Sequence, residues 1–105
     1  MNEAQKKKRN FRSSKIWKAF RHQKNVEQNG LDPITKKKLL KRANLHHMNL
    51  DESKYDDLSH PEEFVFLNSM THDFMHWLFR YYVNDPDIIY RIQQVMEEMV
   101  RINKG

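Results

Sequence analysis

Two pairs of histidines constrain the fold of this chain more than any other feature of its sequence. His46 and His47 are adjacent, and His72 and His76 are four residues apart. Residues four apart on a helix share one face, about 6 Å apart along the axis, whereas adjacent side chains on a strand point to opposite sides. A strand carrying the first pair, folded over a helix carrying the second, would therefore place three imidazoles around one cation and a fourth beside them.

The composition limits how such a site can be built. The chain has 105 residues and no cysteine, which excludes disulfides and cysteine-ligated zinc and leaves His, Asp and Glu as strong metal ligands. The length predicts one small domain, over residues 13–105. Residues 1–12 are lysine-rich without hydrophobic periodicity, and we expect a disordered basic arm there. Because the core is modest, a bound metal would add to its stability.

The net charge of +5 is unevenly distributed along the chain. Residues 1–42 hold 14 Lys and Arg against 3 Asp and Glu, whereas residues 43–105 hold 5 against 11. A basic segment of this size is typical of a protein that binds a nucleic-acid backbone, although a solvated charged tail is the alternative. The candidate phosphate contacts are Lys15, Lys18, Arg21, Lys36, Lys37, Lys38 and Lys41.

The sequence offers no sign of a membrane segment. No apolar run approaches the ~20 residues of a transmembrane helix, and no apolar run follows the charged start as it would in a signal peptide. We therefore expect a cytoplasmic protein without a membrane partner.

The first half of the chain predicts one helix and one short strand. A helix is expected over about 14–28, capped by Ser13 or Ser14 and ended by Asn29-Gly30, with Ile16, Trp17 and Phe20 as its apolar stripe. Residues 39–48 are expected to form a strand despite poor alternation, followed by a polar loop over 49–61.

The second half predicts a strand at 63–67 and two helices. The first helix begins after an N-cap at Asn68 or Ser69, runs to about residue 82, and should be largely buried because apolar residues cover most of its circumference. The last helix is expected over about 85–103, with Pro86 in its first position. Its expected core face comprises Ile88, Ile92, Val95, Met96 and Met99. The predicted class is α+β, mostly helical.

The histidine spacing resembles that of the HNH endonucleases. In their colicin-type members, a His-His pair on a hairpin is followed by a loop and by His-x-x-x-His on a helix, as at His46-His47 and His72-x-x-x-His76. Residues 20–35 are also similar to the lead-in of small phage and bacterial HNH proteins. The resemblance covers about residues 15–80. It implies a ββα-metal, treble-clef-like core at about 32–82 with flanking helices, in a bacterial or phage-infected cell.

The resemblance also implies a function, the metal-dependent hydrolysis of DNA phosphodiester bonds. It makes His46, His72 and His76 the ligands of one divalent ion and His47 the general base that activates water. The ion is Mg²⁺, Mn²⁺, Ni²⁺ or Zn²⁺, and the expected partner is double-stranded DNA. Arg42 and Arg80 are candidates for holding the phosphate.

The sequence departs from the family in two places. It has no cysteines for the structural zinc knuckle of many HNH proteins, and one position of the motif differs. Where the family has an asparagine, nine residues before the first helix histidine, this chain has Glu63. We expect Glu63 to brace the loop or to lie near the metal, with Asn68 as a second candidate for the brace, although helix capping also explains Asn68.

Two other functions remain open. One is a non-catalytic nucleic-acid-binding protein that keeps the fold and a structural metal, which would have no use for the free imidazole of His47. The other is an interaction protein whose last helix pairs with a partner or with itself.

Overall fold

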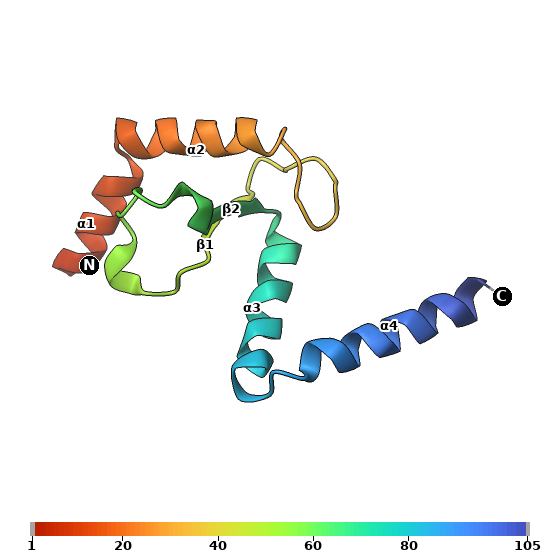
Figure 1. The fold of residues 1–105 in the computed structure, drawn as a ribbon. Coiled ribbons are helices and arrows are strands. Elements are labelled where there is room, and N and C mark those ends of the chain that lie inside the picture. The colour runs from red at the N-terminus through yellow and green to blue at the C-terminus, as the bar shows by residue number, and fades with distance from the viewer. Residues whose placement is uncertain (1, 105) are drawn as a thin grey trace. The chain divides into compact units, whose positions relative to one another are not determined.

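The computed structural model describes residues 2–104, with the side chain of Glu52 left out. Met1, in the predicted arm, and Gly105 lie outside the described residues. The elements in chain order are α1 (Glu3–Arg12), α2 (Lys15–Glu27), β1 (Asn44–His47), β2 (Phe64–Leu67), α3 (Ser69–Asn84) and α4 (Ile88–Lys104), with 3-10 turns at Glu52–Lys54 and Pro61–Glu63 (Figure 1). The predicted α+β, mostly helical class is confirmed.

The chain divides into two compact units, residues 1–72 and residues 73–105. The division falls inside the continuous helix α3, so the expectation of one domain over residues 13–105 stays a prediction. Within residues 2–104, none of the helices has both the length and the apolar character that crossing a membrane requires.

Helix α1 occupies residues for which the sequence predicts a disordered arm. Asn2 and Gln5 form a capping box, in which each side chain accepts a hydrogen bond from the other residue's backbone N–H. At the other end of the helix, the ring of Phe11 lies 5.4 Å from that of Trp17. The cap and this aromatic contact provide the order that the lysine-rich composition does not predict.

Helix α2 confirms the helix predicted over 14–28. Ser14 is its N-cap, and the hydroxyl oxygen accepts a hydrogen bond from the backbone N–H of Trp17 at 3.2 Å. Trp17 and Phe20 are buried as expected, but Ile16 is 70% exposed, so its place in the apolar stripe is wrong. A residue one position before Trp17 lies about 100° around the helix and faces away from the sheet.

Two side chains at the end of α2 bind the backbone of the sheet region. Lys24 is buried, and its ammonium donates to the carbonyl of Pro61 at 2.9 Å, so Lys24 lies on the packed face and not on an outer one. The amide of Gln28 donates to the carbonyl of Phe66 at 3.1 Å and accepts from its N–H at 2.6 Å. Gln28 thereby satisfies backbone groups of β2 on the edge away from β1.

The two strands pair antiparallel, in a register that fixes the direction of both adjacent histidines. His46 is opposite Val65, and His47 is opposite Phe64. Directly opposed residues share a face of the sheet, so His46 and His47 point to different faces, as their adjacency predicts.

The first strand is shorter than the predicted 39–48. Leu39 and Ala43 are both buried, and a turn in which Ala43 N–H donates to the Leu40 carbonyl at 2.9 Å connects them to β1. Burial every fourth residue does not fit the two-residue period of a strand, so pairing begins only at Asn44. The strand predicted over 63–67 is confirmed from Phe64 onward.

Among the described residues, two small clusters contain most of the buried apolar side chains. One comprises Trp17, Phe20 and Phe64, with Phe11, Leu45 and Leu58 packed against it. The other comprises Leu39, Ala43 and Phe66, again with Leu45 against it. Leu45 therefore joins the two clusters through β1.

The predicted burial of the last two helices is wrong. In α3 only Thr71 is buried, and α4 has no buried residue. Large apolar side chains in α3 that are exposed include Phe74, Trp77, Phe79, Tyr81 and Tyr82. The side chains of both core clusters come from residues 11–66, so neither helix contributes a side chain to them.

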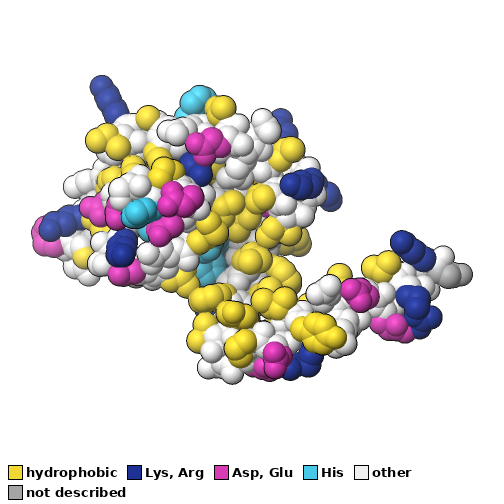
Figure 2. Space-filling view, viewed as in Figure 1, with side chains coloured by type: hydrophobic (Ala, Val, Ile, Leu, Met, Phe, Trp, Pro, Cys, Tyr) yellow, Lys and Arg dark blue, Asp and Glu magenta, His cyan; other side chains and the backbone are white. Residues whose placement is uncertain are grey.

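The last helix also begins later than predicted. Residues Asp85–Asp87 form a turn in which the Asp85 carboxylate accepts from the Asp87 N–H at 3.3 Å, and α4 starts at Ile88. Figure 2 shows hydrophobic side chains at the surface of α4 among acidic and basic ones.

Asp32 is the most buried side chain among the described residues, with no exposed surface. One carboxylate oxygen accepts from the N–H groups of Ile34 at 2.8 Å and Thr35 at 3.2 Å. The other accepts from the Asn68 N–H at 3.0 Å and from the Thr71 hydroxyl. Asp32 thus fastens the turn that follows α2 to the beginning of α3.

These contacts set the charge state of Asp32. Burial raises the pKa of the carboxyl, but the hydrogen bonds from the Thr71 hydroxyl and from the three backbone N–H groups outweigh it, so the pKa is lowered from its ordinary 3.8. The ionised form is therefore stabilised by folding. This contribution is present above the ordinary pKa and is lost as the pH falls through the lowered one.

We predict that Asp32→Ala lowers the free energy of unfolding by about 2–4 kcal/mol at pH 7, because several buried donors lose their acceptor. Urea denaturation measures the change. Asp56→Ala, at an exposed carboxylate, is the matched control and should stay within about 0.5 kcal/mol of the parent. Below about pH 4 the parent should lose stability more steeply than Asp32→Ala; equal slopes would contradict the account.

Candidate metal centre

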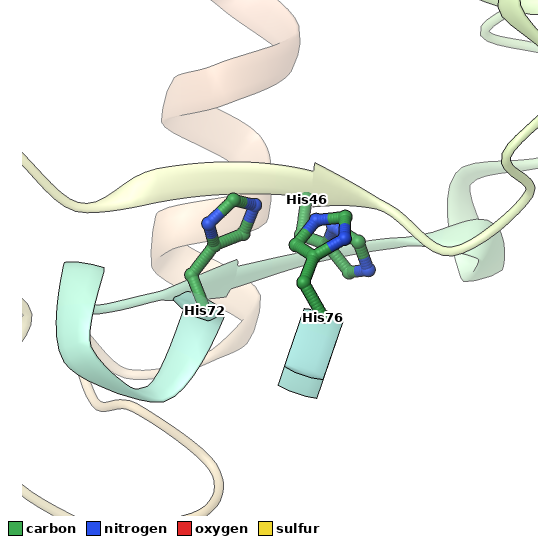
Figure 3. Close-up of side chains that lie close together, drawn as sticks. All are labelled: His46, His72 and His76. Atoms are coloured by element: carbon green, nitrogen blue, oxygen red, sulfur yellow. The ribbon is translucent and has the colours of Figure 1, made fainter. Parts of the chain in front are cut away.

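Three of the four motif histidines converge in the structure. His46 comes from β1, and His72 and His76 come from α3 (Figure 3). All three are partly buried, and one ring nitrogen of each lies within 4.8 Å of the others. The rings of His46 and His72 are 5.1 Å apart and inclined by 77°.

Local structure explains this convergence. Helix α3 begins two residues after the last residue of β2, so its first turns follow directly from the sheet. His72 and His76 share one helix face because they are four residues apart. His46 lies on the face of β1 opposite to that of His47, at the level of Val65 on β2.

The geometry fits a divalent metal ion. Imidazole nitrogens bind zinc at about 2.0–2.1 Å, which places two nitrogens on a tetrahedral ion about 3.4 Å apart. The 4.8 Å limit of the cluster is wider by little more than an ångström, a change that small side-chain rotations accommodate. Three imidazoles suit zinc, nickel or manganese better than magnesium, and three protein ligands leave a coordination position for water or substrate.

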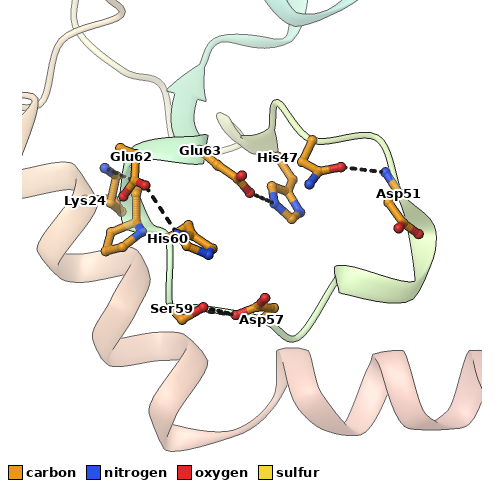
Figure 4. Close-up of polar contacts among 10 residues, drawn as sticks. Lys24, His47, Asp51, Asp57, Ser59, His60, Glu62 and Glu63 are labelled. Atoms are coloured by element: carbon orange, nitrogen blue, oxygen red, sulfur yellow. Dashed lines mark hydrogen bonds and ion pairs between the residues drawn. The ribbon is translucent and has the colours of Figure 1, made fainter.

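The fourth motif histidine has different surroundings. His47 Nε2 lies 3.1 Å from a carboxylate oxygen of Glu63 (Figure 4). The His47 ring also stacks on Phe64, with centroids 4.1 Å apart. The side chain of His47 is 16% exposed and that of Glu63 is 34% exposed. When Nε2–H donates to Glu63, the lone pair of the neutral ring is on Nδ1, which is then able to accept a proton.

Glu63 therefore has a more definite position than the sequence analysis predicts. Its carboxylate contacts His47, and its backbone carbonyl accepts from the Met48 N–H at 2.8 Å, which closes the loop between the strands. The sequence left two roles open, a loop brace or a position near the metal. The carboxylate is not among the grouped metal-ligand atoms of the described residues, and it orients His47.

Asn68 is at the N-cap position of α3, since its carbonyl accepts from the His72 N–H at 2.9 Å. Its side chain, however, braces a different segment. The amide oxygen accepts from the Leu40 N–H at 2.8 Å, and the amide nitrogen donates to the Lys38 carbonyl at 3.1 Å. Asn68 thus links the segment before β1 to the helix that carries two of the histidines.

The two candidate arginines have separate local environments. Arg42 is exposed in the turn before β1. The Arg80 guanidinium lies 5.0 Å from the ring centroid of Trp77, within α3. The roles of both in holding a phosphate stay predictions.

The basic candidates lie at the surface of the first unit. Lys15, Lys18, Lys36, Lys37, Lys38 and Lys41 are exposed. Arg21 is partly buried, with its guanidinium 5.0 Å from the ring centroid of Phe66. Arg21, His22 and Lys41 line an open depression of about 320 Å³ beside β2.

Sequence reasoning missed several residues that position the site. Lys24, Gln28 and Asp32 each bind a distant segment of the chain, and the sequence analysis predicts none of these contacts. The one available signal was Asp32-Pro33-Ile34-Thr35, because aspartate often accepts from backbone N–H groups two and three residues later. Its contact with Asn68 and Thr71 is long-range and leaves no local pattern.

Comparisons of this chain with protein-family models, with curated proteins and with solved structures found no match. The case for function therefore depends on the geometry of the site.

We predict that the folded chain binds one Zn²⁺ or Co²⁺ per protomer through the histidine cluster. Isothermal titration and the visible absorption of Co²⁺ measure binding. His46→Ala, His72→Ala and His76→Ala should each weaken it by about a hundredfold or more, because each removes one of three ligands. His22→Ala is the control and should bind as the parent does. Equal affinity in parent and triad variants would contradict the assignment.

Proposed function

We propose that this protein is a metal-dependent endonuclease of the HNH type that hydrolyses DNA phosphodiester bonds. The observation that carries the proposal is the placement of the four histidines. Three converge from a strand and the following helix, while the fourth points to the other face of the strand and is held by a carboxylate. The order of two antiparallel strands and a helix is the order that a ββα-metal core requires.

The proposed chemistry assigns one task to each group. A divalent ion held by His46, His72 and His76 would supply charge stabilisation to the phosphate and to the leaving oxygen. His47 accepts the proton of the attacking water at Nδ1. Glu63 accepts from Nε2–H, which holds the ring in the required tautomer and stabilises the positive charge that develops on it.

The basic surface supports DNA as the substrate. Charges at Lys15, Lys18 and Lys41 are exposed on the unit that carries β1, as phosphate contacts must be. Such contacts bind the backbone irrespective of sequence, so the proposal includes low sequence specificity. The products are proposed to carry 3′-hydroxyl and 5′-phosphate ends.

Glu63 marks the difference from the usual HNH motif. A carboxylate beside the general base takes the position at which the family has an asparagine. We propose that the Glu63 carboxylate stabilises the imidazolium that forms on His47 in the reaction, because a negative charge lies beside the ring where the family has a neutral amide.

We predict that the protein nicks and linearises plasmid DNA with Mg²⁺, Mn²⁺, Ni²⁺ or Zn²⁺ and not with EDTA. His47→Ala should lower the cleavage rate by about 10²–10⁴-fold, the contribution of a general base, with Co²⁺ affinity within about threefold of the parent. Glu63→Gln should lower the rate by less than His47→Ala does. His60→Ala is the matched control, because His60 also lies beside a glutamate but is outside β1, and this variant should retain full activity.

Two outcomes would contradict the proposal. The absence of cleavage with every metal, together with retained DNA binding and Co²⁺ binding, would favour a structural metal in a nucleic-acid-binding protein. Cleavage that survives His47→Ala unchanged would remove the general base.

A further inference from the structure

Helix α4 carries an apolar seam with the spacing of a coiled coil. Its members, at intervals of four, three, four and three residues, are Ile88, Ile92, Val95, Met99 and Ile102. In heptad notation they alternate between d and a positions. Ile92 is 37% exposed, Val95 61% and Ile102 62%.

This seam needs a cover. Within residues 73–104, helix α3 does not pack along the length of α4. A helix of 17 residues without tertiary packing is only marginally stable in water, and packing of its apolar face is the usual source of its stability. The charged residues beside the seam indicate which partner helix is complementary to it.

We propose that α4 pairs with α4 of a second copy of this chain as an antiparallel two-helix coiled coil. The two-fold axis passes between Gln93 and Gln94. In this register, each Ile88 faces Met99 of the other copy, and each Ile92 faces Val95 of the other copy. The apolar layers are thus formed by a and d positions throughout.

Charge complementarity selects this register. Arg91 and Glu98 occupy the g positions, and antiparallel helices bring g positions of the two chains together. In the proposed register each Arg91 lies beside Glu98 of the other copy, so the dimer has two such pairs. On the other side of the seam, Ile89 lies beside Met96 of the other copy, which adds apolar contact.

Other arrangements lose this complementarity. In the next antiparallel register along the seam, the two-fold axis passes at residue 97, and the two Glu98 carboxylates lie beside each other. A parallel pair places Arg91 beside Met96 and Glu98 beside Asn103, without an ion pair. Within one chain Arg91 pairs with Asp85, and Glu98 with Arg101, in exposed contacts that are weak enough to exchange.

The proposal is independent of the proposed nuclease function, since it uses no residue of the histidine site. Two heptads form a small interface, so we expect a dimer that depends on protein concentration and weakens as salt is added.

Sedimentation equilibrium of the full chain in low salt, over a wide concentration range, tests the proposal. The parent should dimerise. Glu98→Lys and Arg91→Glu should each weaken the dimer by about tenfold, because two attractive pairs become repulsive, and the double variant should return to near the parent. Glu97→Lys, the same charge change at an f position away from the seam, should dimerise as the parent does. Circular dichroism checks that helix content is retained.

Cysteine cross-linking tests the orientation, because the chain has no cysteine of its own. An oxidised mixture of Ile88→Cys and Met99→Cys chains should form a mixed disulfide dimer, and neither variant alone should do so. In the antiparallel register, position 88 of one copy lies about 16 Å along the axis from position 88 of the other, too far for a disulfide between two Ile88→Cys chains. The same separation applies to position 99.

Three results would overturn the proposal. The first is a parent that stays monomeric at every concentration, which would indicate that the seam is covered within the chain. The second is an equal effect of Glu98→Lys and Glu97→Lys on dimerisation. The third is self-cross-linking of either single-cysteine variant, which would indicate a parallel pair.

Discussion

The arrangement of the first unit depends on one buried carboxylate. Asp32 accepts hydrogen bonds from the turn after α2 and from the beginning of α3. Its two partners there, Asn68 and Thr71, are 36 and 39 residues away from it in the chain. His72 follows Thr71 directly, so the contact that fixes the start of α3 also fixes the first helix histidine. Asn68 strengthens this junction through the backbone of the segment before β1. The hydrogen bonds of Asp32 and Asn68 thus add to the stability that the modest apolar core provides.

Rigid elements position the site on both faces of β1. The sheet pairing holds His46 toward α3, and Phe64 and Glu63 hold His47 on the other side. Adjacent residues on the strand therefore lie in two different environments, at a separation that the backbone itself determines. A site on secondary-structure elements is more precisely held than one on loops, which suits metal ligation and proton transfer alike.

The sequence predicted the parts of this arrangement that depend on short-range periodicity. The spacing of four predicted a shared helix face for His72 and His76, and the adjacency of His46 and His47 predicted opposite directions. The same reasoning failed where burial depends on what the rest of the chain supplies. Apolar residues in α3 and α4 were expected in the core, yet Trp77 and Val95 are exposed. The roles of Lys24, Gln28 and Asp32 arise from contacts between distant segments, which composition does not encode.

In the proposed site, three histidines hold a metal ion while the fourth stays outside its coordination sphere. Anomalous diffraction at the Zn²⁺ or Co²⁺ absorption edge, from crystals grown with the ion, would locate that ion. We expect one peak within about 2.0–2.3 Å of ring nitrogens of His46, His72 and His76, with His47 still bound to Glu63. A peak coordinated by His47 and Glu63, or one away from all four histidines, would rule out this site.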